Sequence, residues 1–351
     1  MHGGDRLDRR QAAEWGKPRE HGNTGETIMK IFRSIILTMA ALAVPALAGS
    51  SPVMAQSAGM GTTKTAFTSQ AGTAIAKVVS QNTSIRMRAQ KFGGSSVYVP
   101  LLNKGGIDFA LANELEMLYA VTGTGIYNKK HPNLRIVTVL TPFRTAVFVR
   151  ADSPYRKVSD LKGKRFASGW ASQKIIIPLM NGYFANAGMS YDDVIKIPAR
   201  NVVAGANDFA TGKTDAFFFV FGAGKVRETA AKVGGLRVLG LDDSAGAMAR
   251  LRRHVPPAYA LRVKPSRRNV GVDKPLHVMT YEYLVLTSSK VSDEMVYKVT
   301  KTMHDKPGEL RKSFRALAMF KPNRMAKNFP GLKYHPGAIK YYRELGVWPP
   351  K

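Results

Sequence analysis

The feature that most constrains this chain is a repeated alternation of strand-like and helix-like segments beyond Lys64. Short apolar stretches, each of a length typical of strands, are followed by stretches with helical periodicity. The first series has strands at 65–68, 86–92, 107–112, 134–140 and 146–150 and helices at 72–81, 95–104 and 113–121. Such alternation predicts an α/β fold with mostly parallel sheets covered by helices.

A second series follows the first and ends in a proline-rich stretch. It has strands at 164–168, 195–199, 214–220 and 236–241, helices at 175–187, 202–210 and 225–233, and an irregular excursion at 242–279. A late strand at 281–287 and helices at 292–304, around 308–318 and at 336–345 complete the chain. We therefore expect two lobes, one formed by 60–148 together with 281–351 and the other by 152–276.

Residues 1–55 have the parts of a secretory signal peptide. Lys30 and Arg33 precede the apolar run 35–44, which is too short to span a bilayer. Small residues then lead to Ala55, after which we expect cleavage.

The expected translation start is Met29, which makes residues 1–28 a leader outside the protein. A genuine extension at 1–28 is the alternative, and cleavage after Ala48 is a second choice. No later stretch reaches about 18 consecutive apolar residues, so the mature chain is expected in the periplasm as a soluble protein.

The balance of charge is strongly basic. The chain has 53 Lys and Arg against 24 Asp and Glu, and +27 of its formal net charge of +29 lies beyond residue 55. Such a field favours anionic partners. The basic residues are dispersed, without a dense tract or an aromatic-interleaved motif, so we expect no nucleic-acid partner.

Signatures of catalysis and of metal binding are absent from the sequence. The chain has no cysteine, which excludes disulfides, thiolate metal sites and a cysteine nucleophile. The histidines beyond the signal are scattered without metal-ligand spacing, and no nucleophile elbow or phosphate loop occurs. We expect neither an enzyme nor a cofactor or metal.

Three predicted strand-to-helix junctions are rich in hydroxyl and amide side chains. They contain Ser69 and Gln70, Ser95 and Ser96, and Ser172 and Gln173. Ligands of open α/β sheets bind beyond the carboxyl ends of strands, and helix N-termini there suit a carboxylate. An ordinary helix cap explains each serine equally well, so both interpretations stay open.

Further side chains are candidates at the same edges. Asn113 ends a predicted strand, Arg144 and Lys174 are possible cationic partners, and an aromatic ring of Trp170 or Phe219 could contact a ligand. The alternatives are a helix cap, solvated loop cations and core packing. The junctions contain no acidic residue, so we expect the ligand to be a small mono- or dicarboxylate.

Several motifs, in this order, resemble the TAXI family, the solute receptors of TRAP transporters. They read LLNKGGIDFAL at 101–111, DLKGKR at 160–165, GKTDAFF at 212–218 and HPGAIKYYRE at 335–344. The resemblance runs through nearly the whole mature chain. It departs from the family in the ligand loops, where Tyr98, for example, stands in place of a common Asn.

The resemblance implies a type II periplasmic binding protein fold, in which two lobes close on a solute by a hinge. It also implies docking on a TRAP-type membrane permease. Separately, we expect a monomer and, from the junction residues, a small organic anion, which is a mono- or dicarboxylate or an acidic amino acid. A periplasmic sensor that reports the ligand to a signalling partner is the alternative. Because the departures fall in the ligand loops, the solutes of the family are not transferred.

We predict that the chain is exported and processed. Edman sequencing of protein purified from the periplasmic fraction should begin near Gln56, because the signal is removed after Ala55. Recovery of the intact chain from the cytoplasm would contradict this prediction.

Overall fold

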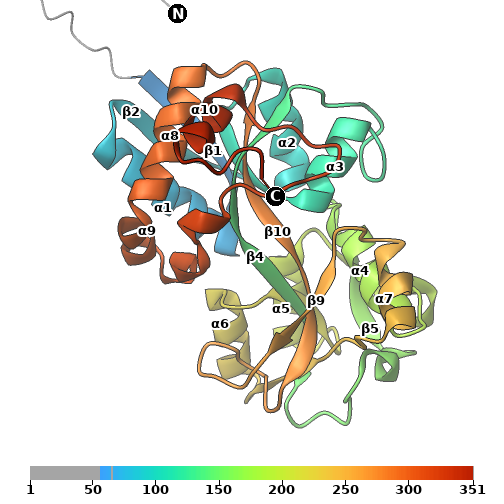
Figure 1. Cartoon of the computed structure of the whole chain (residues 1–351). Coiled ribbons are helices and arrows are strands. Elements are labelled where there is room, and N and C mark those ends of the chain that lie inside the picture. Colours follow the sequence, from blue (N-terminus) through green and yellow to red (C-terminus); the bar gives the residue numbers. More distant parts are fainter. Residues whose placement is uncertain (1–55, 65, 351) are drawn as a thin grey trace, which may run out of the picture. The chain divides into compact units, whose positions relative to one another are not determined.

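The computed structural model of the protein describes residues 56–64 and 66–350, so the predicted cleavage site lies outside the described residues. The strands are β1 (Gln56–Thr63), β2 (Ile85–Phe92), β3 (Phe109–Asn113), β4 (Leu134–Arg150), β5 (Arg165–Gly169), β6 (Ile195–Ala199), β7 (Phe217–Val220), β8 (Leu236–Leu239), β9 (Tyr259–Val263) and β10 (Leu276–Ser288). Figure 1 shows how they are arranged.

The helices follow the strands along the chain. They are α1 (Ala66–Asn82), α2 (Ser95–Lys104), α3 (Glu114–Thr122), α4 (Ile176–Asn186), α5 (Val202–Ala210), α6 (Gly224–Lys232), α7 (Ala245–Arg252), α8 (Asp293–Asp305), α9 (Pro307–Ser313) and α10 (Pro336–Glu344). Short 3-10 turns η1 (Val158–Leu161), η2 (Tyr191–Asp193), η3 (Arg315–Met319) and η4 (Pro322–Arg324) join them. No helix of the described part of the chain is both long and apolar enough to cross a membrane.

The sheets are less parallel than the sequence predicts. Strands β2, β1 and β3 pair in parallel, as do β5 and β6 in a separate two-stranded sheet. In contrast, β10 is antiparallel to β3, β4 and β9, and β4 is antiparallel to β7 and β8. The prediction of mostly parallel sheets was wrong because β4 and β10 run in opposite directions through the middle of the main sheet.

Strands β4 and β10 connect two groups of elements (Figure 1). They pair with each other from Leu134 and Ser288 as far as Phe143 and Tyr281. Beyond this point β4 pairs with β7 and β8, and β10 pairs with β9. We call β1–β3, α1–α3 and α8–α10 the first lobe, and β5–β9 with α4–α7 the second lobe.

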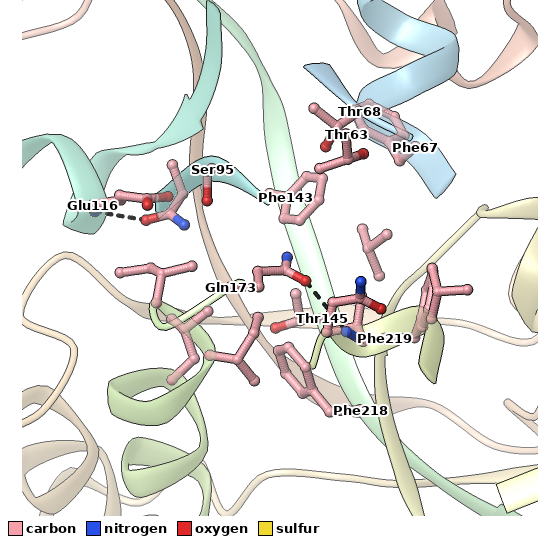
Figure 2. A pocket seen from close by; sticks show the side chains of 18 of the residues that line it. Thr63, Phe67, Thr68, Ser95, Glu116, Phe143, Thr145, Gln173, Phe218 and Phe219 are labelled. Atoms are coloured by element: carbon pink, nitrogen blue, oxygen red, sulfur yellow. Dashed lines mark hydrogen bonds between the residues drawn. The ribbon is translucent and has the colours of Figure 1, made fainter. Parts of the chain in front are cut away.

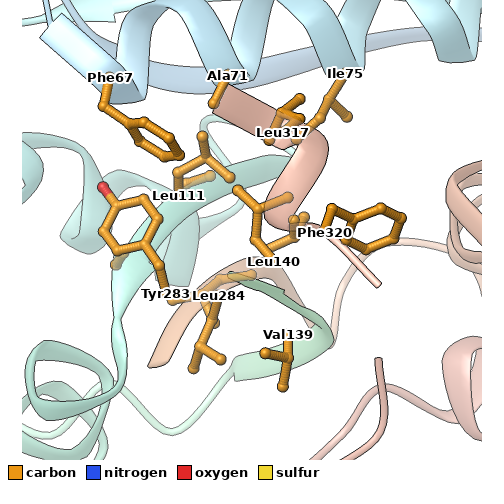
Figure 3. Close-up of a cluster of buried hydrophobic side chains, with 14 of the residues drawn as sticks. Phe67, Ala71, Ile75, Leu111, Val139, Leu140, Tyr283, Leu284, Leu317 and Phe320 are labelled. Carbon is orange, nitrogen blue, oxygen red and sulfur yellow. The ribbon is translucent and has the colours of Figure 1, made fainter. Parts of the chain in front are cut away.

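Buried side chains fix the C-terminal part of the chain on the first lobe (Figure 3). Leu317 and Phe320, in and after η3, pack between α1 and the paired strands β4 and β10, where they contribute to the same buried cluster as Ile75 and Leu284. A second cluster, formed mainly by elements of the second lobe, surrounds Tyr183 and Phe184 of α4.

Most of the predicted elements are present, and two regions differ. Of the residues predicted as the first strand, 65–68, those at 66–68 belong to the start of α1, and the first strand lies before them, at β1. This strand is hard to detect because glycines replace the β-branched residues typical of strands. At Gly61 a Cβ atom would lie 2.5 Å from Ile107 Cδ1, so a larger residue would displace that side chain.

The stretch 242–279, predicted as irregular, contains α7, β9 and the first residues of β10. Its four prolines lie outside these elements and separate them, at positions 256, 257, 265 and 275. The predicted strands 134–140 and 146–150 are likewise one strand, β4, which continues through Pro142. Prolines at these positions separate regular elements or lie within a strand, and they do not make the whole stretch irregular.

Candidate functional site

A cavity of 360 Å³ lies between the two lobes, at the point where β4 and β10 separate (Figure 2). Its apolar lining consists of Phe67, Phe143, Ile175, Ile176, Leu179, Val202, Val203, Phe218, Phe219, Val220, Tyr281 and Tyr283. Its polar lining consists of Thr63, Lys64, Thr68, Ser95, Asn113, Glu116, Thr145, Ser172, Gln173, Arg200 and Asn201. We call this space the cleft cavity. A predominantly apolar lining with a few polar groups is typical of small-molecule sites.

Aromatic rings from both central strands form one wall of the cleft cavity. Phe143 of β4 stacks on Tyr283 of β10 with 4.2 Å between ring centroids. Phe67 of α1 meets the face of Phe143 edge-on at 5.3 Å. The hydroxyl groups of Tyr283 and Thr68 are hydrogen-bonded to each other at 2.8 Å, so this wall presents mainly carbon to a ligand.

The N-terminus of α2 faces the cleft cavity without a side-chain cap. Its N-cap residue is Gly94, which has no side chain to accept from the first turn. Ser95, the first residue of the helix, is buried and lines the cavity. Among the described residues, no protein group accepts a hydrogen bond from the Ser95 or Ser96 N–H. These donors and the positive end of the helix dipole suit an anionic group.

The N-terminus of α5, on the other side of the cleft cavity, is occupied by protein groups. Asn201 caps the helix by accepting from the Ala204 N–H at 3.0 Å. The Oε1 atom of Gln173 accepts from the Val202 N–H at 3.3 Å. Gln173 therefore positions α5, and its side-chain oxygen is not free for a ligand.

The cavity wall contains one buried carboxyl group, Glu116 of α3. Asn113 caps this helix, with Oδ1 accepting from the Glu116 N–H at 2.8 Å. The carboxyl group of Glu116 instead accepts from the Tyr127 hydroxyl at 3.1 Å, with Ser96 Oγ at 3.5 Å. Burial raises its pKa to about 7. Within the described residues no cation pairs with it.

Five of the twelve predicted site residues line the cleft cavity. They are Ser95, Asn113, Ser172, Gln173 and Phe219. Structural partners are present as well, since Asn113 caps α3 and Gln173 holds α5. Ser172 Oγ contacts the Gly93 and Arg200 carbonyls. The structural interpretation therefore holds for these side chains, and their role in ligand binding stays a prediction.

The other predicted residues of the first lobe lie outside the cavity lining. Ser69 and Gln70 are inside α1, because this helix begins earlier than predicted, and Ser69 Oγ donates to the Lys64 carbonyl at 3.4 Å. Ser96 faces Glu116 and the second lobe. Tyr98 is fully buried and donates to the Leu111 carbonyl.

The three remaining predicted residues have other surroundings. Trp170 is buried, and its Nε1 atom donates to the Tyr191 hydroxyl at 2.9 Å, so it packs beneath its loop. Lys174 is exposed. Arg144 lines a second cavity, on the far side of Phe67 and Phe143.

Sequence reasoning missed Glu116, because the expectation of no acidic residue rested on the three junctions alone and this one lies in α3. The spacing of Asn113 and Glu116 matches a capping pattern, in which an acidic residue at the third helical position turns back to the cap. Because this pattern accounts for an acidic residue at position 116 as part of a helix start, the sequence contains no separate sign that Glu116 lines a cavity. Lys64 and Arg200 were missed because single loop cations carry no spacing signal.

Two loops from opposite lobes touch at the edge of the cleft cavity. Ser172 Oγ lies 3.3 Å from the Gly93 carbonyl oxygen, and the Lys174 N–H donates to Ser96 Oγ at 3.1 Å. A Cβ atom on Gly94 would lie 1.7 Å from the Ser172 carbonyl oxygen, so only glycine permits this approach. We call this contact the loop contact; it holds the two lobes together beside the cavity.

Across residues 56–64 and 66–350, no three His, Asp or Glu side chains are grouped so as to hold a metal ion. The cleft cavity offers hydrogen-bonding groups, apolar surface, the cationic side chains of Lys64 and Arg200 and the carboxyl group of Glu116.

Comparison with known proteins gives both a family and a fold. Residues 57–346 match the model of the NMT1-like family. PhnD1 from Prochlorococcus marinus in complex with methylphosphonate has a TM-score of 0.54 at 10% identity, covering 83% of this chain and 98% of its own. A structure described as a periplasmic transporter has a TM-score of 0.51 at 13% identity, covering 77% and 89%.

The alkanesulfonate-binding protein SsuA from Xanthomonas axonopodis bound to MOPS has a TM-score of 0.49 at 17% identity, covering 82% of this chain and 90% of its own. The likenesses above 0.5 show the fold, which is the type II periplasmic binding protein fold with two α/β lobes and a cleft between them. The predicted fold class is confirmed.

We predict that the loop contact can be trapped by a disulfide in Gly93→Cys/Ser172→Cys. A Cβ atom at residue 93 would lie 3.3 Å from Ser172 Cβ, close to the separation within a disulfide. The chain has no cysteine of its own, so oxidation should remove both thiols, as measured with Ellman's reagent. Each single variant should keep its thiol. Two free thiols in the oxidised double variant would contradict the contact.

Proposed function

The chain belongs to the NMT1-like family, and on this premise we propose that it is a periplasmic solute-binding protein for a small organic anion. It captures the solute in the cleft cavity and delivers it to a membrane permease, and its work is binding without covalent chemistry. The observation that carries the proposal is an uncapped helix N-terminus at one end of an otherwise largely apolar cavity between two lobes.

The lining supports a solute with one acidic group and an apolar body. A carboxylate at the start of α2 would accept from the Ser95 and Ser96 N–H groups and from the Ser95 hydroxyl. The body of the solute would then lie along Phe143 and Tyr283 and against aliphatic side chains of the second lobe, such as Leu179. An apolar body is favoured because its burial from water contributes most of the affinity.

Glu116 takes part in this model in its protonated form. With a pKa of about 7, the neutral carboxyl group donates a hydrogen bond to an oxygen of the solute at slightly acidic pH. The ionised form would place a second negative charge beside the carboxylate. Other ionisable groups near it are Tyr98, Tyr127 and Tyr283, and burial raises the pKa of each tyrosine above its ordinary value.

We further propose that the lobes, 60–148 with 281–351 and 152–276, close around the solute in a monomer. The hinge is the point where Phe143 and Tyr281 end the pairing of β4 with β10. The chain would then dock on a permease, and the resemblance to TAXI receptors favours one of the TRAP type.

We expect Ser95→Ala to weaken binding of the preferred solute about ten-fold or more, because a hydrogen bond to a charged group contributes about 1.5–3 kcal/mol. Calorimetry against organic acids with short and long apolar bodies, amino acids, polyamines and sugars identifies that solute. Ser313→Ala, an exposed serine outside the cavity, is the control. Preference for a polyamine or a neutral sugar, or unchanged affinity in Ser95→Ala, would overturn the assignment.

Binding of a carboxylate should weaken as pH rises above about 7. The free protein must then protonate Glu116 before it binds, so the affinity should be about ten-fold lower at pH 8 than at pH 6. Glu116→Gln keeps a hydrogen-bond donor that does not titrate, and its affinity should be flat over this range. Stronger binding at pH 8 would indicate a cationic group against ionised Glu116, as in an amino acid, and would overturn the protonated model.

A further inference from the structure

A second cavity, of 620 Å³, adjoins the cleft cavity and has a different chemistry. The two share Phe67, Phe143 and Val220, so the edge-on pair of phenylalanine rings forms a partition between them. The cleft cavity contains a buried carboxyl group. The lining of the second cavity contains no carboxyl group and five guanidinium groups, which belong to Arg144, Arg227, Arg267, Arg268 and Arg315. We call it the arginine cavity.

These arginines come from both lobes and from the hinge. Arg315 is on η3, which Leu317 fixes to the first lobe. Arg227 is on α6, while Arg267 and Arg268 follow β9 in the second lobe. Arg144 is on β4, directly after the last residue that pairs with β10. Four separate segments of the sequence therefore bring five positive charges to one cavity.

The positive charge of this cavity is not neutralised by the protein. Among the described residues, none of the five arginines forms an ion pair. Arg144 is half-buried and has only a long contact, 3.4 Å, from Nη1 to Asn269 Oδ1, and a position 5.7 Å from the centre of the Phe221 ring. By contrast, Arg165 on the surface is paired with Asp215 at 2.6 Å. The other four arginines are exposed, and like charges that line one cavity favour an anion between them.

We propose that the arginine cavity is a binding site for a small polyanion, a molecule with two or more phosphate, sulfonate or carboxylate groups. Guanidinium groups match oxyanions by forming paired hydrogen bonds, and several of them are needed to neutralise more than one negative charge. The aromatic rings of Phe221 and Phe314 leave room for an apolar part of the same molecule. Because the lining includes both lobes and the hinge, the polyanion would favour the arrangement in which they lie close.

The test uses inorganic pyrophosphate as the probe, titrated into the mature protein by calorimetry at constant ionic strength. The informative variant is Arg267→Gln/Arg268→Gln, two exposed residues whose replacement leaves the core intact. The matched control is Arg86→Gln/Arg88→Gln, which removes the same charge from exposed positions on β2, a strand that contributes nothing to the cavity. Thermal unfolding of both variants confirms that each is folded.

We expect saturable binding with one pyrophosphate per chain, weakened about ten-fold or more in the cavity variant and by less than about two-fold in the control. An equal loss of pyrophosphate affinity in both variants would show that only the overall positive charge of the protein attracts the probe. That result, or the absence of saturable binding, would overturn the proposed site. Tighter binding of a glutamate-rich peptide would assign the surface to a protein partner instead. Ser95→Ala should bind pyrophosphate normally, which separates this proposal from that for the cleft cavity.

Discussion

The structure depends on two long antiparallel strands that pair along half of their length and then separate. In the first lobe, β4 and β10 are neighbours in one sheet, and beyond Phe143 and Tyr281 each has different partners in the second lobe. The cleft cavity lies where the two strands separate, and Phe143 and Tyr281, the last residues that pair, are part of its lining. The same strands therefore connect the two lobes and contribute Phe143, Thr145, Tyr281 and Tyr283 to the lining of the candidate site.

Charge is distributed unevenly around this crossing. On one side of the phenylalanine partition a buried carboxyl group lies among tyrosines, and on the other side five arginines line a cavity whose described lining contains no carboxyl group. Glu282, on β10 next to the crossing, is fully buried, and its Oε1 atom accepts from Lys327 at 2.8 Å while Oε2 has no hydrogen-bond partner among the described residues. The apolar rings of the partition exclude water and ions, so charges on its two sides are screened from each other less than they would be in water.

The alternation of strands and helices was sufficient to predict the fold class, since apolar periodicity depends on short segments of sequence. Helix α2 and helix α5 begin and end where predicted. Strand β1 was not predicted, because glycine and alanine pack it against its neighbours, and that packing is set by residues far along the chain. The antiparallel pairing of β4 with β10 likewise joins segments that are far apart in the sequence, so the pattern of residues within either strand does not predict it.

The candidate site was predictable where a side chain follows a strand directly, as with Ser95, Asn113 and Ser172. Glu116 was hidden because its spacing from Asn113 has an ordinary explanation as a helix start. The arginine cavity was hidden for a different reason. Its residues come from four separate segments, and dispersed basic residues look the same in a sequence whether they converge in space or point into solvent.

The loop contact has a consequence for how this protein can change over generations. It consists of backbone atoms, two serine hydroxyls and a glycine that accepts no replacement, and it overlaps the start of α2, where Gly94 and Ser96 lie. The aromatic wall and Glu116 are contributed by other residues. Substitutions in that wall can therefore change the surface offered to a solute while the loop contact between the lobes is inherited intact.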